Sequence, residues 1–271
     1  MDGLDDVVAA ETVLSDVDGA AGRLVIRGHA LVELSGHVAF EEAAHILLHG
    51  LLADLPDVAG FRRRLGLARE QVFDHVAALD AGLAALPPID VVRALMARLP
   101  DGDDLDCALR LIAGPAVFTA ATIRARRGEA PLAPDPKLGH AADALRMIQG
   151  ATPSPAASAA LDAYLVTIID HGLNASTFAA RVTASTLAGL TSAVLAGVSA
   201  LKGPLHGGAP GPVIEMLDEI GSPECAVPWL EASLDRGERL MGFGHRIYRA
   251  PDAASACTAC FRQSARGSRT R

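Results

Sequence analysis

The sequence predicts an all-α protein, from its composition and from the spacing of its apolar residues. Half of the 271 residues are hydrophobic but only 4% are aromatic, so alanine, leucine and valine must form most of the core. Alanine and leucine have high intrinsic helix propensity. Several long stretches also carry apolar side chains at helical spacing between glycine and proline breaks. A chain of this length can bury one large core or two smaller ones.

One extended segment precedes a series of predicted helices. Residues 22–29 (GRLVIRGH) place β-branched residues between glycines and predict a short strand or extended arm. Proline is too frequent in residues 128–140 for a helix, so a surface loop is expected there. The apolar spacing predicts helices at residues 37–52, 62–79, 89–98, 105–126, 141–148, 154–168, 212–220 and 227–236.

Residues 176–200 are rich in Ala, Leu, Ser and Thr and predict a central or interface helix. The apolar part, residues 187–200, is too short to span a bilayer and is flanked by Arg181 and Lys202. Residues 1–11 are acidic and lack the basic region of a secretory signal. We therefore expect no membrane segment and a cytoplasmic protein.

The charge and the cysteines argue against several classes of protein. A net charge of −8 argues against a long nucleic-acid-binding surface, because such a surface is basic. Cys257 and Cys260 form a single C-x-x-C pair, which supplies only half of a zinc site. His45 and His49 follow Glu41 at helical spacing, but without an HExxH arrangement an amphipathic helix edge is the better interpretation. We expect no metal.

Three of the nine histidines lie in unusual settings. His171 opens a helical run in DHGLNASTFAARVTAST, His206 lies in the loop GPLHGGAP, and His245 follows a Gly-x-Gly turn in GFGHRIYR. The glycine loop has no Lys-Ser/Thr pair after it, so it is not a nucleotide P-loop, and no GxSxG elbow is present. A lone histidine in such a place is usually structural, but three together predict a site.

Five blocks of sequence resemble, in order, the motifs of the citrate synthase family, of the bacterial citrate and 2-methylcitrate synthase type. They are VVAAETVLSDVDGAAGRLVIRGH, FEEAAHILLHG, DHGLNASTFAARVTAST, LKGPLHGGAPGPVIEML and GFGHRIYR. The resemblance extends to about Asp252. It implies an all-α, citrate synthase-like large helical domain at residues 1–206, an incomplete small domain at residues 207–252, and a tail unrelated to the family at residues 253–271.

The resemblance implies an acyltransferase that condenses acetyl-CoA with oxaloacetate to give citrate and CoA, without a metal or redox cofactor. By the family pattern, His206 donates a hydrogen bond to the developing enolate oxygen, a role that suits a neutral imidazole. His245 bonds the ketone oxygen of oxaloacetate, and His171 binds the same substrate from the other side. His206 and His245 are the expected catalytic residues.

Further roles follow from the same resemblance. Arg249 is expected to contact the CoA phosphates, where a guanidinium suits the anion. The backbone at Gly242 and Gly244 is expected to line the adenine pocket. The family also implies a homodimer, with residues 176–200 suited to the interface.

The sequence departs from the family after the last block. The catalytic aspartate of the family lies well downstream of this block, whereas the chain ends 26 residues (271 − 245) after His245. The family's Asp-Pro-Arg triplet is replaced by Asp252-Ala253-Ala254. We therefore expect impaired condensation. The alternatives are a non-catalytic helical fragment that dimerises or binds CoA, and a 2-methylcitrate synthase that uses propionyl-CoA.

Overall fold

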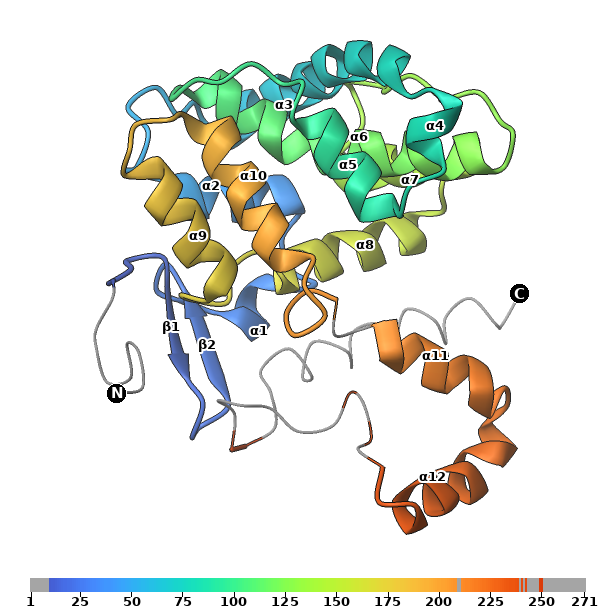
Figure 1. The fold of residues 1–271 in the computed structure, drawn as a ribbon. Coiled ribbons are helices and arrows are strands. Elements are labelled where there is room, and N and C mark those ends of the chain that lie inside the picture. Colours follow the sequence, from blue (N-terminus) through green and yellow to red (C-terminus); the bar gives the residue numbers. More distant parts are fainter. Residues whose placement is uncertain (1–9, 209–210, 239, 241, 243–248, 251–271) are drawn as a thin grey trace.

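The structure, a computed structural model, describes residues 10–208, 211–238, 240, 242 and 249–250. The described part is mainly helical, which confirms the predicted fold class. In Figure 1 the helices α1 to α10 pack into one body, beneath which a small β-sheet projects, while α11 and α12 lie apart from it. The predicted division into domains stays a prediction.

A three-stranded antiparallel sheet precedes the helices. Its strands are β1 (Ser15–Asp18), β2 (Arg23–Ile26) and β3 (His29–Ala30), in that order. Only β2 falls clearly within the predicted strand, because the sequence of β1, SDVD, is too polar to mark it. On β2, Leu24 and Ile26 are buried and pack with residues of α1 (Leu31–Leu34), α2 (Phe40–Leu48) and α8 (Pro155–Thr167). The sheet is therefore held by a small core of its own.

The main core forms around α6 (Leu105–Arg126), whose bounds agree with the prediction. This helix packs against α3 (Val58–Phe73), α5 (Pro88–Met96) and α7 (His140–Gln149). A short 3-10 helix, η1 (Asp74–Ala78), and α4 (Ala81–Ala84) connect α3 to α5. By length and composition α6 is apolar enough to cross a membrane, but more than half of its most apolar stretch is buried inside the protein. It serves here as the central core helix.

Local sequence signals explain where several helices begin. A side-chain oxygen accepts a hydrogen bond from a backbone N–H of the first turn, which satisfies a donor that the helix itself leaves free. Proline also occupies the first position of α5 and α8, where its missing N–H has no cost. The capping residues are Asp57 for α3, Asp80 for α4, Asp104 for α6, Ser154 for α8 and Asn174 for α9.

The proline-rich loop predicted at residues 128–140 is held against α3 by Arg69, whose buried ion pair with Asp143 joins α3 to α7. Arg69 Nε lies 2.8 Å from Asp143 Oδ2, and both side chains are completely buried. Arg69 Nη2 also donates to the carbonyl oxygens of Asp135, at 3.1 Å, and Leu138, at 2.8 Å. A Cβ atom at Gly66 would overlap the carbonyl oxygen of Pro136. The loop therefore lies directly on the backbone of α3.

Residues 176–200 form two helices, not the single helix that the sequence predicts. They are α9 (Ala175–Ala184) and α10 (Leu190–Leu201), which pack side by side. Leu187 and Gly189 have positive φ angles, 60° and 93°, where the chain reverses. Asp101 accepts hydrogen bonds from Ser192 N, at 3.2 Å, and Ser192 Oγ, at 2.6 Å. This contact from a distant loop caps α10, and the apolar composition of residues 187–200 does not predict it.

The described chain continues with α11 (Gly211–Ile220), a 3-10 helix η2 (Pro223–Cys225) and α12 (Ala226–Asp235). Both α-helices agree with the predicted positions. Their apolar side chains are largely exposed: Ile214, Leu217, Val227 and Leu234.

Candidate active site

The first part of the site is the N-terminus of α9, which the sequence DHGLNAST builds. Asn174 has an extended backbone, and its Oδ1 accepts the N–H groups of Ser176 and Thr177, each at 3.1 Å. Thr177 Oγ1 in turn accepts the N–H of Asn174 at 2.7 Å. This reciprocal pair is a capping box, and it fixes the start of the helix. The segment that carries His171 therefore enters α9 in a defined direction.

The second part is the loop that carries His206. After α10 the chain turns back, so that the N–H of His206 bonds the carbonyl of Gly203 at 3.0 Å and that of Gly207 bonds the carbonyl of Leu201 at 2.7 Å. A Cβ at Gly207 would lie 2.6 Å from the Leu201 oxygen, and one at Gly208 would lie 3.0 Å from the Gly203 oxygen. Both glycines are thus required by the close approach of the loop to the end of α10.

A hydrogen-bonded chain joins the two parts. His206 Nε2 lies 2.9 Å from Ser176 Oγ, and Ser176 Oγ lies 2.7 Å from Asn174 Oδ1. The packing of the two helices makes this possible, because Gly197 of α10 lies against the carbonyl of Ser176 and the side chain of Ala180. The ring of His206 is partly buried. The structure therefore brings His206 next to the segment that begins with His171.

The single hydroxyl proton of Ser176 permits two arrangements of this chain. If Ser176 donates to Asn174, His206 must donate from Nε2 and keeps a free lone pair on Nδ1. If Ser176 donates to His206 Nε2, the neutral ring carries its proton on Nδ1 and can donate to a ligand. In the second arrangement the bond from Ser176 to Asn174 Oδ1 is given up, and Asn174 Oδ1 keeps only the two backbone N–H groups that it also accepts.

The end of α10 is tied to α5 just before the His206 loop. Lys202 Nζ lies 2.5 Å from Asp90 Oδ1, and both side chains are partly buried. The hydrogen bond from Lys202 is the largest influence that holds the pKa of Asp90 below its ordinary value. Because Lys202 lies four residues before His206, this pair fixes the point where the loop leaves the helix.

The remaining predicted site residues are described only in part. His171 is exposed, and within the described residues its ring makes no hydrogen bond. Gly242 is exposed with a φ of 83°, and a Cβ there would lie 3.3 Å from Val213 Cγ2. The side chain of Arg249 is exposed, while its backbone N–H bonds the carbonyl of Gly19. His245 and Gly244 lie outside the described residues, so the expected convergence of His206 and His245 stays a prediction.

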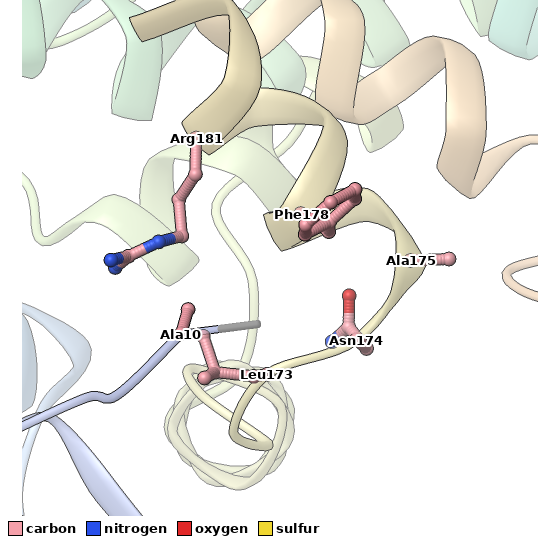
Figure 2. Close-up of a pocket in the computed structure, with 6 residues that line it drawn as sticks. All are labelled: Ala10, Leu173, Asn174, Ala175, Phe178 and Arg181. Atoms are coloured by element: carbon pink, nitrogen blue, oxygen red, sulfur yellow. The ribbon is translucent and has the colours of Figure 1, made fainter. Parts of the chain in front are cut away.

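A cavity of about 330 Å³ lies beside the start of α9 but on its other face. Figure 2 shows Phe178 and Arg181 on α9 and Leu173 and Asn174 on the segment before it. Helical spacing puts the lining residues on the face opposite to Ser176 and Ala180, which contact α10. No predicted site residue in the described part of the chain lines this cavity, so we do not assign it to the substrates.

Sequence reasoning missed Ser176 and Lys202. The spacing Asn174-x-x-Thr177 is a recognisable capping signal that fixes Ser176 in the first turn of a helix. Nothing in the sequence connects that turn to His206, 30 residues later. No group of three or more histidine, cysteine or acidic residues in the described part of the chain is arranged to hold a metal. His45 Nε2 instead bonds the carbonyl of Pro56 at 2.8 Å, and Cys257 and Cys260 lie outside the described residues.

Comparison with known proteins gives one consistent family. The family model described as "Citrate synthase, C-terminal domain" matches residues 3–265, which includes 13 residues beyond Asp252 (265 − 252). The citrate synthase of Haloferax volcanii is 37% identical over 266 residues, which is 92% of this chain and 70% of the relative. The 2-methylcitrate synthase of Mycobacterium tuberculosis is 39% identical over 263 residues, 93% of this chain and 66% of the relative.

Solved structures agree with these relatives. A citrate synthase from Thermotoga maritima MSB8 has a TM-score of 0.81 at 31% identity and covers 97% of this chain, while 72% of that protein is covered. The citrate synthase of Thermoplasma acidophilum, solved as a ternary complex with carboxymethyl coenzyme A and oxaloacetate, has a TM-score of 0.77 at 28% identity. The match covers 92% of this chain and 68% of that one. The chain thus spans about two thirds to 72% of the lengths of these proteins.

Proposed function

Because the chain belongs to the citrate synthase family, we propose that it condenses acetyl-CoA with oxaloacetate and hydrolyses the thioester with water to give citrate and CoA. We propose that this activity is impaired, because no residue matches the family's catalytic aspartate. The reaction begins when a general base takes a proton from the methyl group of the thioester, a weak carbon acid, and we assign that base to no described residue. Negative charge then develops on the thioester oxygen, and a hydrogen-bond donor fixed in advance beside that oxygen stabilises it. The single observation that supports this proposal is the contact between Ser176 Oγ and His206 Nε2, which lie 2.9 Å apart.

His206 is suited to be this donor in the arrangement where Ser176 donates to its Nε2. The ring is then neutral and carries its proton on Nδ1, and the Ser176 hydroxyl has turned from Asn174 to the ring. Gly207 and Gly208 let the loop lie close to Leu201 and Gly203, so the backbone that carries His206 is fixed before the substrate arrives. We propose that His245 bonds the ketone oxygen of oxaloacetate, that His171 binds its carboxylate side, and that Arg249 contacts the CoA phosphates.

Release of the CoA thiol tests the proposal directly. Purified protein is mixed with acetyl-CoA and oxaloacetate, and free thiol is followed by absorbance. We expect release that depends on both substrates, and a loss of about 10²–10³-fold in His206→Ala, as for removal of one such donor elsewhere. The matched control is His75→Ala, because His75 lies in η1, away from this site. Binding of both substrates without thiol release would favour the non-catalytic alternative, and an unchanged rate in His206→Ala would contradict the proposed role.

Propionyl-CoA is the second candidate acyl donor, because relatives of similar identity include both a citrate synthase and a 2-methylcitrate synthase. One additional methylene changes discrimination by about 1–3 kcal/mol, which is a measurable ratio of rates. The same assay with each thioester at equal concentration decides between them. We expect acetyl-CoA to be the faster substrate, and faster release from propionyl-CoA would reverse the assignment.

We further propose a cytoplasmic homodimer that needs no metal or redox cofactor. The outer face of α9 supports the dimer, because Phe178 and Val182 are 45% and 52% exposed there. Two cysteines of the described part, Cys107 and Cys225, are free thiols, which suits a reducing compartment. Sedimentation equilibrium tests the dimer, and activity after exhaustive treatment with EDTA tests the absence of a metal.

A further inference from the structure

Strand β1 contacts two segments that are far apart in the sequence and that both carry predicted substrate-binding residues. Ser15 Oγ donates a hydrogen bond to Asp170 Oδ1, next to His171. At the turn that follows the strand, the carbonyl of Gly19 accepts the N–H of Arg249 at 2.7 Å. In Figure 1 the hairpin of β1 and β2 extends from below α9 to the last described residues at its tip. One short strand therefore touches both segments.

At the first contact, the backbone around His171 is fixed from both sides. Asp170 Oδ1 accepts the N–H of Gly172 at 2.9 Å in addition to the hydroxyl of Ser15. Gly172 has a φ of 74°, and a Cβ there would lie 3.3 Å from Val17 Cγ2. The loop thus lies directly on the strand, while the ring of His171 remains exposed. Ser15 contacts this loop and not the ring itself.

At the second contact, Asp18 shapes the turn that presents the carbonyl of Gly19. Its Oδ1 accepts the N–H groups of Ala20, at 3.1 Å, and Ala21, at 2.9 Å. These two bonds close the turn and set the direction of the Gly19 carbonyl toward Arg249. Arg249 is exposed.

The strand between these contacts is held in place through its pairing with β2, whose side chains pack in the core. β1 pairs with β2 along its whole length, from Ser15 with Ile26 to Asp18 with Arg23. Ile26 is completely buried, so β1 cannot shift without disturbing packed side chains. From Ser15 to Gly19 the chain extends by about 13 Å, at roughly 3.3 Å per residue. This separation suits two different ligands, a keto acid at one end of the strand and the phosphates of CoA at the other.

We propose that β1 is a positioning strand that holds the keto-acid segment and the CoA-phosphate segment of the site at a fixed separation. Ser15 is the positioning residue for the keto acid, and Asp18 is the positioning residue for CoA. The inference rests on the proposed function, because that function assigns oxaloacetate to His171 and the CoA phosphates to Arg249. Its distinctive consequence is that the two ends of one strand affect two different ligands.

Calorimetric titration of the full chain with oxaloacetate and, separately, with CoA tests this consequence. We expect Ser15→Ala to raise the Kd for oxaloacetate about five- to tenfold, as for the loss of one hydrogen bond, with the Kd for CoA unchanged. We expect Asp18→Ala to raise the Kd for CoA and to leave that for oxaloacetate unchanged. Ser15→Thr keeps the hydroxyl on a residue that favours strands, and it should restore wild-type binding.

Asp16→Ala is the matched control, because Asp16 lies between the two residues, is exposed and points to the face of β1 opposite to Ser15. It should change neither Kd. If Ser15→Ala and Asp18→Ala each weaken both ligands equally, or if neither weakens any ligand, the strand has no positioning role and the inference is overturned while the proposed function stands. Wild-type protein that binds neither ligand would overturn the proposed function, and this inference with it.

Discussion

Replacing Asp143 by asparagine should strongly destabilise the protein. The Asp143 carboxylate bonds Arg69 Nε at 2.8 Å, Arg146 Nε at 2.9 Å and the N–H of Asp135 at 3.1 Å, with no exposure to solvent. The amide can accept only part of these bonds, and the guanidinium of Arg69 is left as an uncompensated buried charge. Breaking a buried pair in this way costs about 3–5 kcal/mol.

For a protein of this size, each kcal/mol lowers the melting temperature by about 2–4 °C, so Asp143→Asn should melt about 6–20 °C below the wild type. The loss of helical circular dichroism on heating measures this difference. Asp106→Asn is the matched control, because Asp106 lies 2.6 Å from Arg64 but both side chains are well exposed. An exposed pair contributes about 0–1 kcal/mol. Equal melting temperatures for the two variants would refute the reasoning from burial.

Three further results are expected. Burial, with a smaller effect of Arg69, lowers the pKa of His140 from 6.5 to about 3; its neutral ring therefore stabilises the fold above pH 6.5, and this stability is lost as the pH falls. Between pH 7 and pH 5 the wild type should lose about 2 kcal/mol more than His140→Gln, measured by urea denaturation at each pH. Gly207→Ala should push the His206 loop off the end of α10 and lower kcat about 10–100-fold with little change in the melting temperature; an unchanged kcat would mean that the loop tolerates the methyl group. Lys202→Met should raise the pKa of Asp90, observed by NMR titration of its carboxyl group, since the bond from Lys202 is the main cause of the lowered value; a pKa that stays low would assign the effect to Arg93 instead.

Much of the helical fold could be predicted because local signals agree with tertiary packing. The bounds of α6 follow from Asp104, which caps it, and from a long apolar pattern. The break between α9 and α10 could not be predicted, since residues 185–189 contain no proline and the reversal depends on Asp101 capping α10 from 91 residues away. The strand β1 was missed for a similar reason: its polar sequence becomes a strand because β2 pairs with it.

Part of the candidate site could likewise be predicted from the sequence, and part could not. His206 was predicted, because the glycines around it signal unusual backbone geometry that the structure then shows at Gly207. Its partner Ser176 was not, because a hydrogen bond across a helical hairpin leaves no trace in either segment alone. Capping of α9 by Asn174 marks the helix start but says nothing of the neighbouring loop.

The loop at residues 128–140 has the composition of a segment that proteases attack first, yet it should resist them. Arg69 holds two of its carbonyl groups, and Gly66 lets it lie on the backbone of α3 without a gap. A protease must pull the chain out of the fold to cleave it, so cleavage there requires α3 and α7 to separate. Amide hydrogens such as that of Asp135 should then exchange with deuterium only when the whole molecule unfolds. Their exchange rates would therefore report the free energy of global unfolding.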